Sequence, residues 1–242
     1  MSGWVYHRRG LAFSVQHWQY NRALNIVSDL IPDPLAIGLW LALALGVLWH
    51  VRHCPWHMLG DRDNLNVFLG ATVAVLTLWM IRTGIKPGLS FHLLGATALT
   101  LMFRPSHALF ALALVTGAVT LWDGQYKAYP ANLLIMGVVP VLVSWTLFRL
   151  VDRRLPNHMF VYIFLNAFFG AAAAVFAVGL ASTALLAAMG AYTLDYLLRE
   201  YLPYYLLMAW SEAFVTGMIV TLLVVYRPQW VATFDDRRYL NR

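Results

Sequence analysis

The chain has 242 residues, of which 61% are apolar and 12% are charged, and its formal net charge is +6. Soluble domains are about half apolar and about a quarter charged, so this chain has too little polar surface to face water on every side. We therefore expect an all-α protein, a polytopic helical bundle integral to a membrane. Its basic residues lie in short loops and form no continuous stripe, so nucleic acid is not an expected partner.

Other functions are excluded by what the sequence lacks. Cys54 is the only cysteine, so no intramolecular disulfide is possible. No segment has the G-x-x-x-x-G-K-[ST] pattern of ATP-binding loops, so any ATP-driven work has to be done by another chain. We also find no pair of nucleophile and base, and we do not expect an enzyme.

Residues 1–29 form an N-terminal extension that has no apolar run long enough to span a membrane. This extension is an amphipathic surface piece, a disordered tail, or a stretch upstream of a shorter natural start, and we favour the surface segment. Residues 30–228 are expected to form a single transmembrane domain. Residues 229–242 are expected to be a cytoplasmic tail.

Seven apolar runs predict about seven transmembrane helices. A full span needs about 20 apolar residues, and several runs are shorter. Either these helices borrow flanking residues, or some begin below the membrane surface, where loops dip inward and are sheltered by protein or water. The runs are residues 35–51, 67–81, 91–103, 109–121, 133–150, 160–189 and 204–226, and residues 193–202 predict an interfacial helix.

The distribution of Lys and Arg predicts the orientation of the bundle. These residues are more numerous in the links that share a side with the C-terminus than in the links on the opposite side. Short cytoplasmic loops carry an excess of basic residues. We therefore expect a multi-pass protein of the bacterial inner membrane, with its N-terminus outside and its C-terminus in the cytoplasm.

His92 is the first candidate for a functional residue. It lies in TGIKPGLSFHLLGATALTLMF (residues 83–103), where a loop broken by glycine and proline becomes an apolar helix. A histidine at the mouth of a membrane helix is costly without a partner. One interpretation is a loop histidine bonded to a backbone carbonyl. The other is a metal ligand, because a neutral imidazole binds Ni, Co, Zn or Cu.

Glu212 is the second candidate, because the pattern places its carboxyl inside the last span. Such a charge needs a partner or a proton. One interpretation is a hydrogen bond to a neighbouring helix, with Ser211 or Asn166 as partner. The alternative is a relay or supporting role at a binding site.

The segment H-x-x-H-C-x-x-H, formed by His50, His53, Cys54 and His57, has nitrogen and sulfur donors for Zn or Cu. Pro55 disfavours a site on one helical face, because the residue before a proline is pushed out of the helical region. This segment either binds a metal or simply ends the first helix.

Four segments resemble motifs of one family. PGLSFHLLGA (87–96) is similar to the "PGG-x-S-x-HLLGA" signature of the CbiM/NikM-like substrate-capture subunits of cobalt and nickel importers in the energy-coupling factor class. The resemblance covers roughly residues 30–228, with the motifs in the same order. The other segments are DG (123–124) with ANLLIMG (131–137), EAFVTG (212–217), and LIPD (30–33), which falls where the family opens with "M-H-I-P-D-G".

The resemblance implies a cobalt or nickel ion as cargo, with no resident cofactor. The family holds its metal near the outer face with nitrogens from the N-terminus, from the opening histidine, and from the histidine that corresponds to His92. It also implies two kinds of partner, a transmembrane coupling subunit and cytoplasmic ATPases. That division of work agrees with the missing ATP-binding loop.

The chain departs from this family at the opening motif. Leu30 stands in place of the metal-binding histidine, and Pro34 stands in place of the following glycine. Replacement ligands are available in Asp29 and Asp33, or in His7 and His17 of the extension. Asp33 has an alternative role as a cap of the first helix.

We therefore expect a permease subunit for transition-metal import, with His92 and Asp33 as metal ligands. Gly88, Ser90, Asn132 and Glu212 are expected to shape the pocket. The alternative is a non-transporting membrane scaffold or assembly subunit that kept the fold and lost the metal site.

Overall fold

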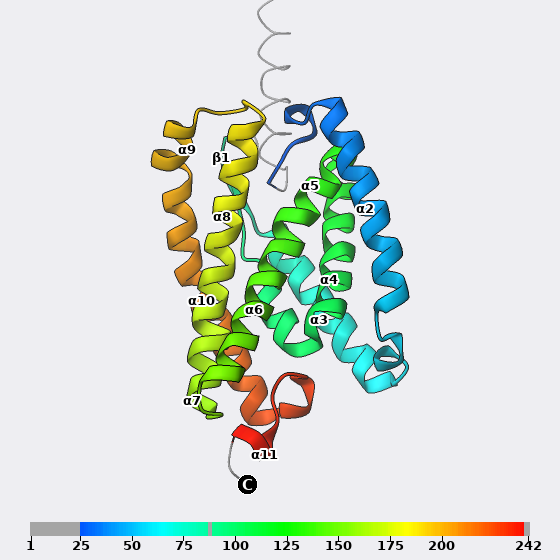
Figure 1. The fold of residues 1–242 in the computed structure, drawn as a ribbon, viewed down its shortest axis with the longest axis vertical. Helices are drawn as coiled ribbons and strands as arrows, with labels where there is room; N and C mark the ends of the chain where they lie inside the picture. The colour runs from blue at the N-terminus through cyan, green and yellow to red at the C-terminus, as the bar shows by residue number, and fades with distance from the viewer. Residues whose placement is uncertain (1–24, 87–88, 240–242) are drawn as a thin grey trace, which may run out of the picture.

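Long helices standing side by side make up almost the whole molecule (Figure 1). The structure, a computed structural model, describes residues 25–86 and 89–239. The long helices are α2 (Asp33–His53), α3 (Arg62–Met80), α4 (Ala96–Asp123), α6 (Val139–Arg154), α8 (Gly170–Ala188) and α10 (Leu202–Tyr226).

Short helices and turns join the long ones. The short α-helices are α5 (Tyr129–Leu133), α7 (Met159–Val161), α9 (Leu194–Glu200) and α11 (Asp236–Tyr239). Two π-helical stretches, Leu134–Val138 and Tyr162–Phe169, lead into α6 and α8. Turns of 3-10 helix lie at Ser28–Leu30, Trp56–Leu59, Tyr126–Ala128 and Pro228–Trp230.

Local chemistry explains where the first two long helices begin. Asp33 and Pro34 occupy the first turn of α2, where a proline costs nothing because its missing N–H would have no helical partner. The carboxylate of Asp61 caps α3 by accepting the backbone N–H of Asn64 at 3.1 Å. The outward faces of these helices are apolar, as lipid contact requires: Leu41, for example, is 62% exposed.

Six segments of the described chain are long and apolar enough to cross a membrane. The expectation of an all-α polytopic membrane bundle is therefore confirmed. About seven helices were predicted and six long segments are found, because the third and fourth predicted runs (91–103 and 109–121) are joined in α4. The backbone is non-helical at Arg104, so the predicted Arg-Pro-Ser-His link does separate two helical pieces within this element.

A break at Arg104 divides α4 into two legs. Its backbone has φ 62° and ψ 168°, which no helix contains, and Pro105 follows directly. We call residues 96–103 the half-helix. The half-helix begins beside Val75 of α3, where a Cβ on Gly95 would approach the Val75 side chain to 2.8 Å. It ends beside Phe68, whose ring lies 5.4 Å from that of Phe103.

The second leg of α4 runs back in the opposite direction. The ring of Phe110, in this second leg, stacks on the ring of Phe68 near the start of α3, with 6.0 Å between the ring centres. The last residue of this leg, Asp123, pairs with Arg82 beyond the end of α3, at 2.6 Å. The first leg therefore runs antiparallel to α3 and the second leg runs parallel to it. The half-helix thus begins inside the bundle, after a buried strand, which is the arrangement expected of a helix that begins below the membrane surface.

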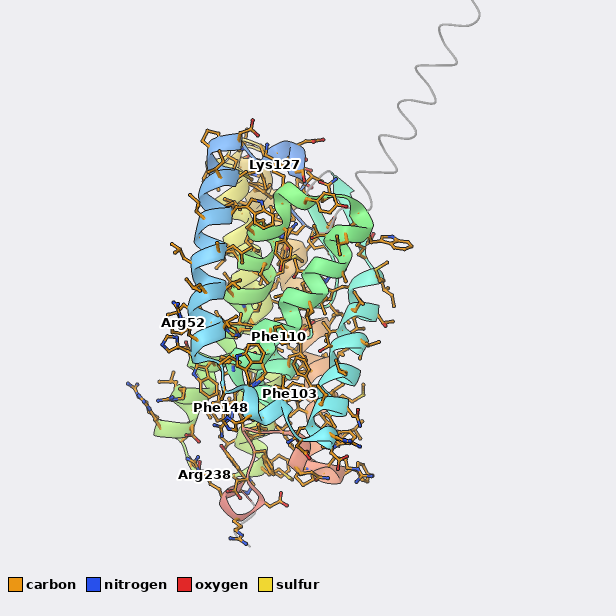
Figure 2. The ribbon with its side chains drawn as sticks, turned by 90° about the vertical axis from the view of Figure 1, so that its right-hand side faces the viewer. Arg52, Phe103, Phe110, Lys127, Phe148 and Arg238 are labelled. Carbon is orange, nitrogen blue, oxygen red and sulfur yellow. The ribbon has the colours of Figure 1, made fainter. Side chains whose placement is uncertain are left out.

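Because the half-helix adds a reversal, the chain enters and leaves the bundle at opposite ends. Figure 1 shows α2 starting at the top and the chain after α10 ending at the bottom. Figure 2 shows Lys127 at the same end as the start of α2, and Arg238 at the far end.

A small hairpin connects α3 to the half-helix and was not predicted. Strands β1 (Thr83–Lys86) and β2 (Leu89–Phe91) pair antiparallel, with Thr83 opposite Phe91 and Gly84 opposite Ser90. All three residues of β2 are buried. The hairpin brings the residue after β2, His92, into the bundle from one end.

The described part of the C-terminal tail folds back against the bundle. The half-helix breaks at Arg104, so its last carbonyls lack helical partners. Two of them are satisfied by tail amides: Ala232 N donates to Met102 O at 2.9 Å, and Thr233 N donates to Leu101 O at 3.2 Å. The tail is thus an ordered part of the fold.

Candidate metal-binding site

His92 lies between β2 and the half-helix and is 5% exposed. Its Nδ1 is 3.1 Å from the carbonyl oxygen of Leu93. A carbonyl only accepts hydrogen bonds, so Nδ1 carries the proton and Nε2 presents a lone pair. Nε2 is buried and has no hydrogen-bond partner among the described residues. The carbonyl-bonded interpretation therefore holds for one nitrogen, and the other nitrogen is free to bind a ligand.

The surroundings keep this imidazole neutral. Burial is the main cause that lowers the pKa of His92 to about 4, and the positive charge of Arg82 lowers it further, against the opposing effect of the bond to Leu93. The ring also lies 4.6 Å from the ring of Trp79. Trp79 is itself fixed, because its indole N–H donates to Leu94 O at 3.0 Å. A neutral imidazole held in one orientation is the form that coordinates transition metals.

Asn132 holds the first described residues inside the bundle. Its Oδ1 accepts the backbone N–H of Ile26 at 2.8 Å, and its Nδ2 donates to Ile26 O at 3.0 Å. Ile26 is 0% exposed and Val27 is 1% exposed. Asn132 therefore clamps the backbone of Ile26 at two points.

Residues 25–27 are all buried, and we call them the inserted segment. Its first described residue, Asn25, was not a candidate in the sequence analysis. Its Nδ2 donates to Ser182 Oγ at 2.8 Å, and its Oδ1 accepts the hydroxyl of Tyr201 at 2.9 Å. The Tyr201 ring packs at 5.5 Å from that of Phe91, the neighbour of His92. The available signal was a polar residue, Asn25, directly before two apolar ones, Ile26 and Val27. It was missed because residues 1–29 were interpreted as an extension.

The opening motif was placed at Leu30, yet the buried segment is residues 25–27. Leu30 is partly exposed and lies in a 3-10 turn, Ser28–Leu30. The backbone N–H of Ser28 donates to Gln125 Oε1 at 2.7 Å, which ties this turn to the next loop. The part of the chain that is buried against Asn132 and Tyr201 thus precedes Leu30.

Asp33 faces outward and pairs with Lys127. Its side chain is 86% exposed, and it makes no capping hydrogen bond to α2, so the capping alternative is wrong. Asp29 is also exposed. Neither carboxylate has a described contact with His92.

Glu212 binds the backbone that follows His92. Its Oε2 accepts the N–H of Leu94 at 2.8 Å, and its Oε1 accepts the N–H of Gly95 at 2.7 Å. These amides precede the half-helix, whose N-terminal end favours a negative charge. Of the two expected interpretations, the hydrogen-bonded carboxyl is therefore the one that the geometry supports.

The partners proposed for Glu212 from the sequence were wrong. Ser211 donates instead to Leu207 O in its own helix, at 3.3 Å. Asn166 is 1% exposed, and neither atom of its side-chain amide has a hydrogen-bond partner among the described residues. The two backbone N–H groups of Leu94 and Gly95 give the Glu212 carboxylate two hydrogen bonds, which stabilise its charge more than a bond from the single neutral side chain of Ser211 or Asn166 would.

The remaining expected pocket residues belong to the hairpin. Ser90 is 1% exposed and lies opposite Gly84. Gly88 lies outside the described residues, as do His7 and His17.

The cysteine and histidine segment at the end of α2 does not assemble as a metal site. Cys54 Sγ approaches His107 Nε2 at 3.8 Å, and His53 Nδ1 bonds to Trp49 O at 2.7 Å. In residues 25–86 and 89–239, no three His, Cys, Asp or Glu side chains meet as metal ligands. This segment ends the first helix, as its alternative interpretation proposed.

The fold and site define a multi-pass membrane protein with one sheltered imidazole near the end of the bundle where the chain enters. Residues 25–230 match the CbiM family, described as the cobalt uptake substrate-specific transmembrane region, and the chain belongs to this family. Members of this family are membrane components of metal uptake and not enzymes. The match begins at Asn25, the first residue of the inserted segment.

Two solved structures have a similar fold. One, described as a transition metal transporter, has a TM-score of 0.72 and 18% identity and covers 82% of this chain and 92% of its own. The other, described as a truncated transition metal transporter, has a TM-score of 0.68 and 18% identity, with coverages of 84% and 99%. No curated protein matches the sequence.

Proposed function

We propose that this protein captures a transition metal ion, cobalt or nickel, as the substrate-binding subunit of an energy-coupling factor importer in the bacterial inner membrane. The observation that carries the proposal is the free, buried Nε2 of His92. A desolvated lone pair with no donor facing it is costly, and a metal ion would satisfy it. Family membership supports the same assignment.

His92 needs further donors to hold a cation. Among the described residues, no three His, Cys, Asp or Glu side chains form a common ligand group. We propose that the extension supplies them, because His7 and His17 lie in the 24 residues that precede Asn25.

The orientation and partners follow from charge. We propose that the end carrying Arg238 is cytoplasmic and that the end carrying Lys127 and the hairpin faces outside (Figure 2). The energy would come from cytoplasmic ATPases through a transmembrane coupling subunit, because this sequence has no ATP-binding loop.

Metal binding by the purified full chain tests the proposal. We expect about one nickel or cobalt ion per chain, lost in His92→Ala and in the double variant His7→Ala/His17→Ala. His158→Ala is the matched control, because His158 is exposed and lies before α7. Stoichiometric binding retained in His92→Ala would reject this site. Binding retained only in the double variant would confine the ligands to the described residues.

A second function, a non-transporting scaffold or assembly subunit, is favoured by one observation. Leu30 replaces the histidine of the opening motif, and no group of three such ligands exists in the described chain. A wild-type protein that binds neither cobalt nor nickel, yet purifies folded, would select this alternative.

A further inference from the structure

A hollow of about 880 Å³ lies at the end of the bundle opposite the hairpin. The end of α6, the break in α4 and the folded-back tail enclose it. Five arginines from these three segments line it, and we call it the arginine hollow. They are Arg104, Arg149, Arg153, Arg237 and Arg238.

Arg104 enters the hollow from a strained backbone. Its φ of 62° with ψ of 168° is a conformation used almost only by glycine. A non-glycine residue there has a conformational cost that a glycine would avoid. Within the part of the chain that the structure describes, its guanidinium makes one long hydrogen bond, 3.4 Å from Nη2 to Ala232 O. Among the described residues, the Arg104 side chain therefore makes no short hydrogen bond that would offset the cost of its backbone conformation.

Two of the three carboxylates that line the hollow have partners within the chain. Asp152 accepts Arg238 Nη2 at 2.8 Å and the hydroxyl of Tyr239 at 3.2 Å. Asp235 accepts the backbone N–H of Arg237 at 2.9 Å. With Asp236, three aspartates face the five arginines, which leaves two positive charges in excess.

The walls of the hollow are amphipathic. Trp145 and Phe148 stack at 5.2 Å and contribute apolar surface. The guanidinium of Arg149 lies 5.8 Å from the ring centre of Trp145. Both rings belong to α6, close to its end at Arg154 and so close to the end of a membrane span.

We propose that the arginine hollow binds the phosphate group of an anionic phospholipid from the adjacent leaflet. Planar guanidinium forks match phosphate oxygens, and basic pockets at the ends of membrane helices suit anionic headgroups. The bias of basic residues toward one side of the membrane explains why arginines lie at this end. It does not explain why three separate segments converge on one hollow, or why one of them accepts strain. The aromatic wall favours a lipid over a free phosphate ion.

Thermal unfolding of the delipidated full chain in detergent tests this proposal, with phosphatidylglycerol, phosphatidylcholine and inorganic phosphate as separate additions. We expect phosphatidylglycerol alone to raise the melting temperature. The double variant Arg149→Gln/Arg153→Gln should bind it roughly tenfold more weakly or worse. Arg154→Gln is the matched control, because Arg154 has the same charge at the same helix end but does not line the hollow.

A second variant separates binding from folding. Arg104→Gly relaxes the backbone, so without lipid its melting temperature should equal or exceed that of the wild type, while its response to phosphatidylglycerol should fall. Equal responses of the wild type and the double variant, or an equal effect of phosphatidylcholine, would overturn the proposal. An equal effect of inorganic phosphate would assign the site to the free anion instead of the lipid.

Discussion

The carboxylate of Glu212 and the backbone N–H of Gly95 are joined by a hydrogen bond of 2.7 Å, although 117 residues separate them in the sequence. The second carboxylate oxygen accepts the N–H of Leu94. α10 therefore holds Gly95, which directly precedes the half-helix and lies three residues after His92. At the other end, the tail bonds to Leu101 and Met102. The half-helix is thus fixed at both ends.

Glu212→Gln is expected to destabilise the protein and to weaken metal binding. An amide offers one oxygen, and its NH2 group would face a backbone N–H with no acceptor between them. A buried donor left unsatisfied costs about 1–3 kcal/mol. Differential scanning fluorimetry and nickel titration measure the two effects.

Ser211→Ala is the control for that substitution, because Ser211 is exposed and its hydroxyl bonds only within its own helix. An unchanged melting temperature in Glu212→Gln would show that the two amides do not depend on a carboxylate.

Gly95→Ala is expected to be more damaging than an ordinary glycine substitution. Gly95 has φ +65°, and an added Cβ would lie 2.8 Å from Val75 Cγ2. The conformational cost is about 1–2 kcal/mol, and the overlap adds to it. Gly190→Ala provides the comparison, because Gly190 has φ +67° but open space around it.

Chemical denaturation of both variants separates the two costs. The double variant Gly95→Ala/Val75→Ala should recover the part due to overlap and keep the conformational part. If Gly95→Ala and Gly190→Ala lose the same stability, the contact with Val75 does not constrain the loop.

The sequence was enough to predict the membrane bundle and to single out His92 as a candidate residue. Both predictions depend on local signals, namely hydropathy and a histidine at the mouth of an apolar run. The sequence also indicated the break at Arg104, because an Arg-Pro pair between two apolar runs is typical of a link, but it failed to predict that the helix before this break is as short as residues 96–103. It also failed for Asn25 and for the partners of Glu212. Those contacts join distant parts of the chain, and the period of a helix does not specify which distant backbone a side chain meets.

Asn132→Ala is expected to release the inserted segment without unfolding the bundle. Asn132 satisfies both the N–H and the carbonyl of Ile26, which is 0% exposed. Loss of these bonds should raise the sensitivity of the N-terminal region to limited proteolysis and lower metal affinity. Asn64→Ala is the control, because Asn64 is exposed and the bond it makes to Asp61 uses its backbone N–H. Equal proteolysis of the two variants would argue against a clamp.

Thr233→Val tests whether the tail supports the site from the far end of the half-helix. The Thr233 hydroxyl donates to Leu101 O at 2.7 Å and lies 2.6 Å from the hydroxyl of Tyr162, so it accepts from Tyr162. Valine keeps the shape and removes both bonds, at a cost of about 1–2 kcal/mol. Because the half-helix is a short rigid element between Leu101 and the loop of His92, we expect nickel affinity to fall together with the melting temperature. Thr233→Ser keeps the hydroxyl and should restore both values. A variant that loses stability at unchanged affinity would show that the tail holds the fold and leaves the position of His92 to Glu212 alone.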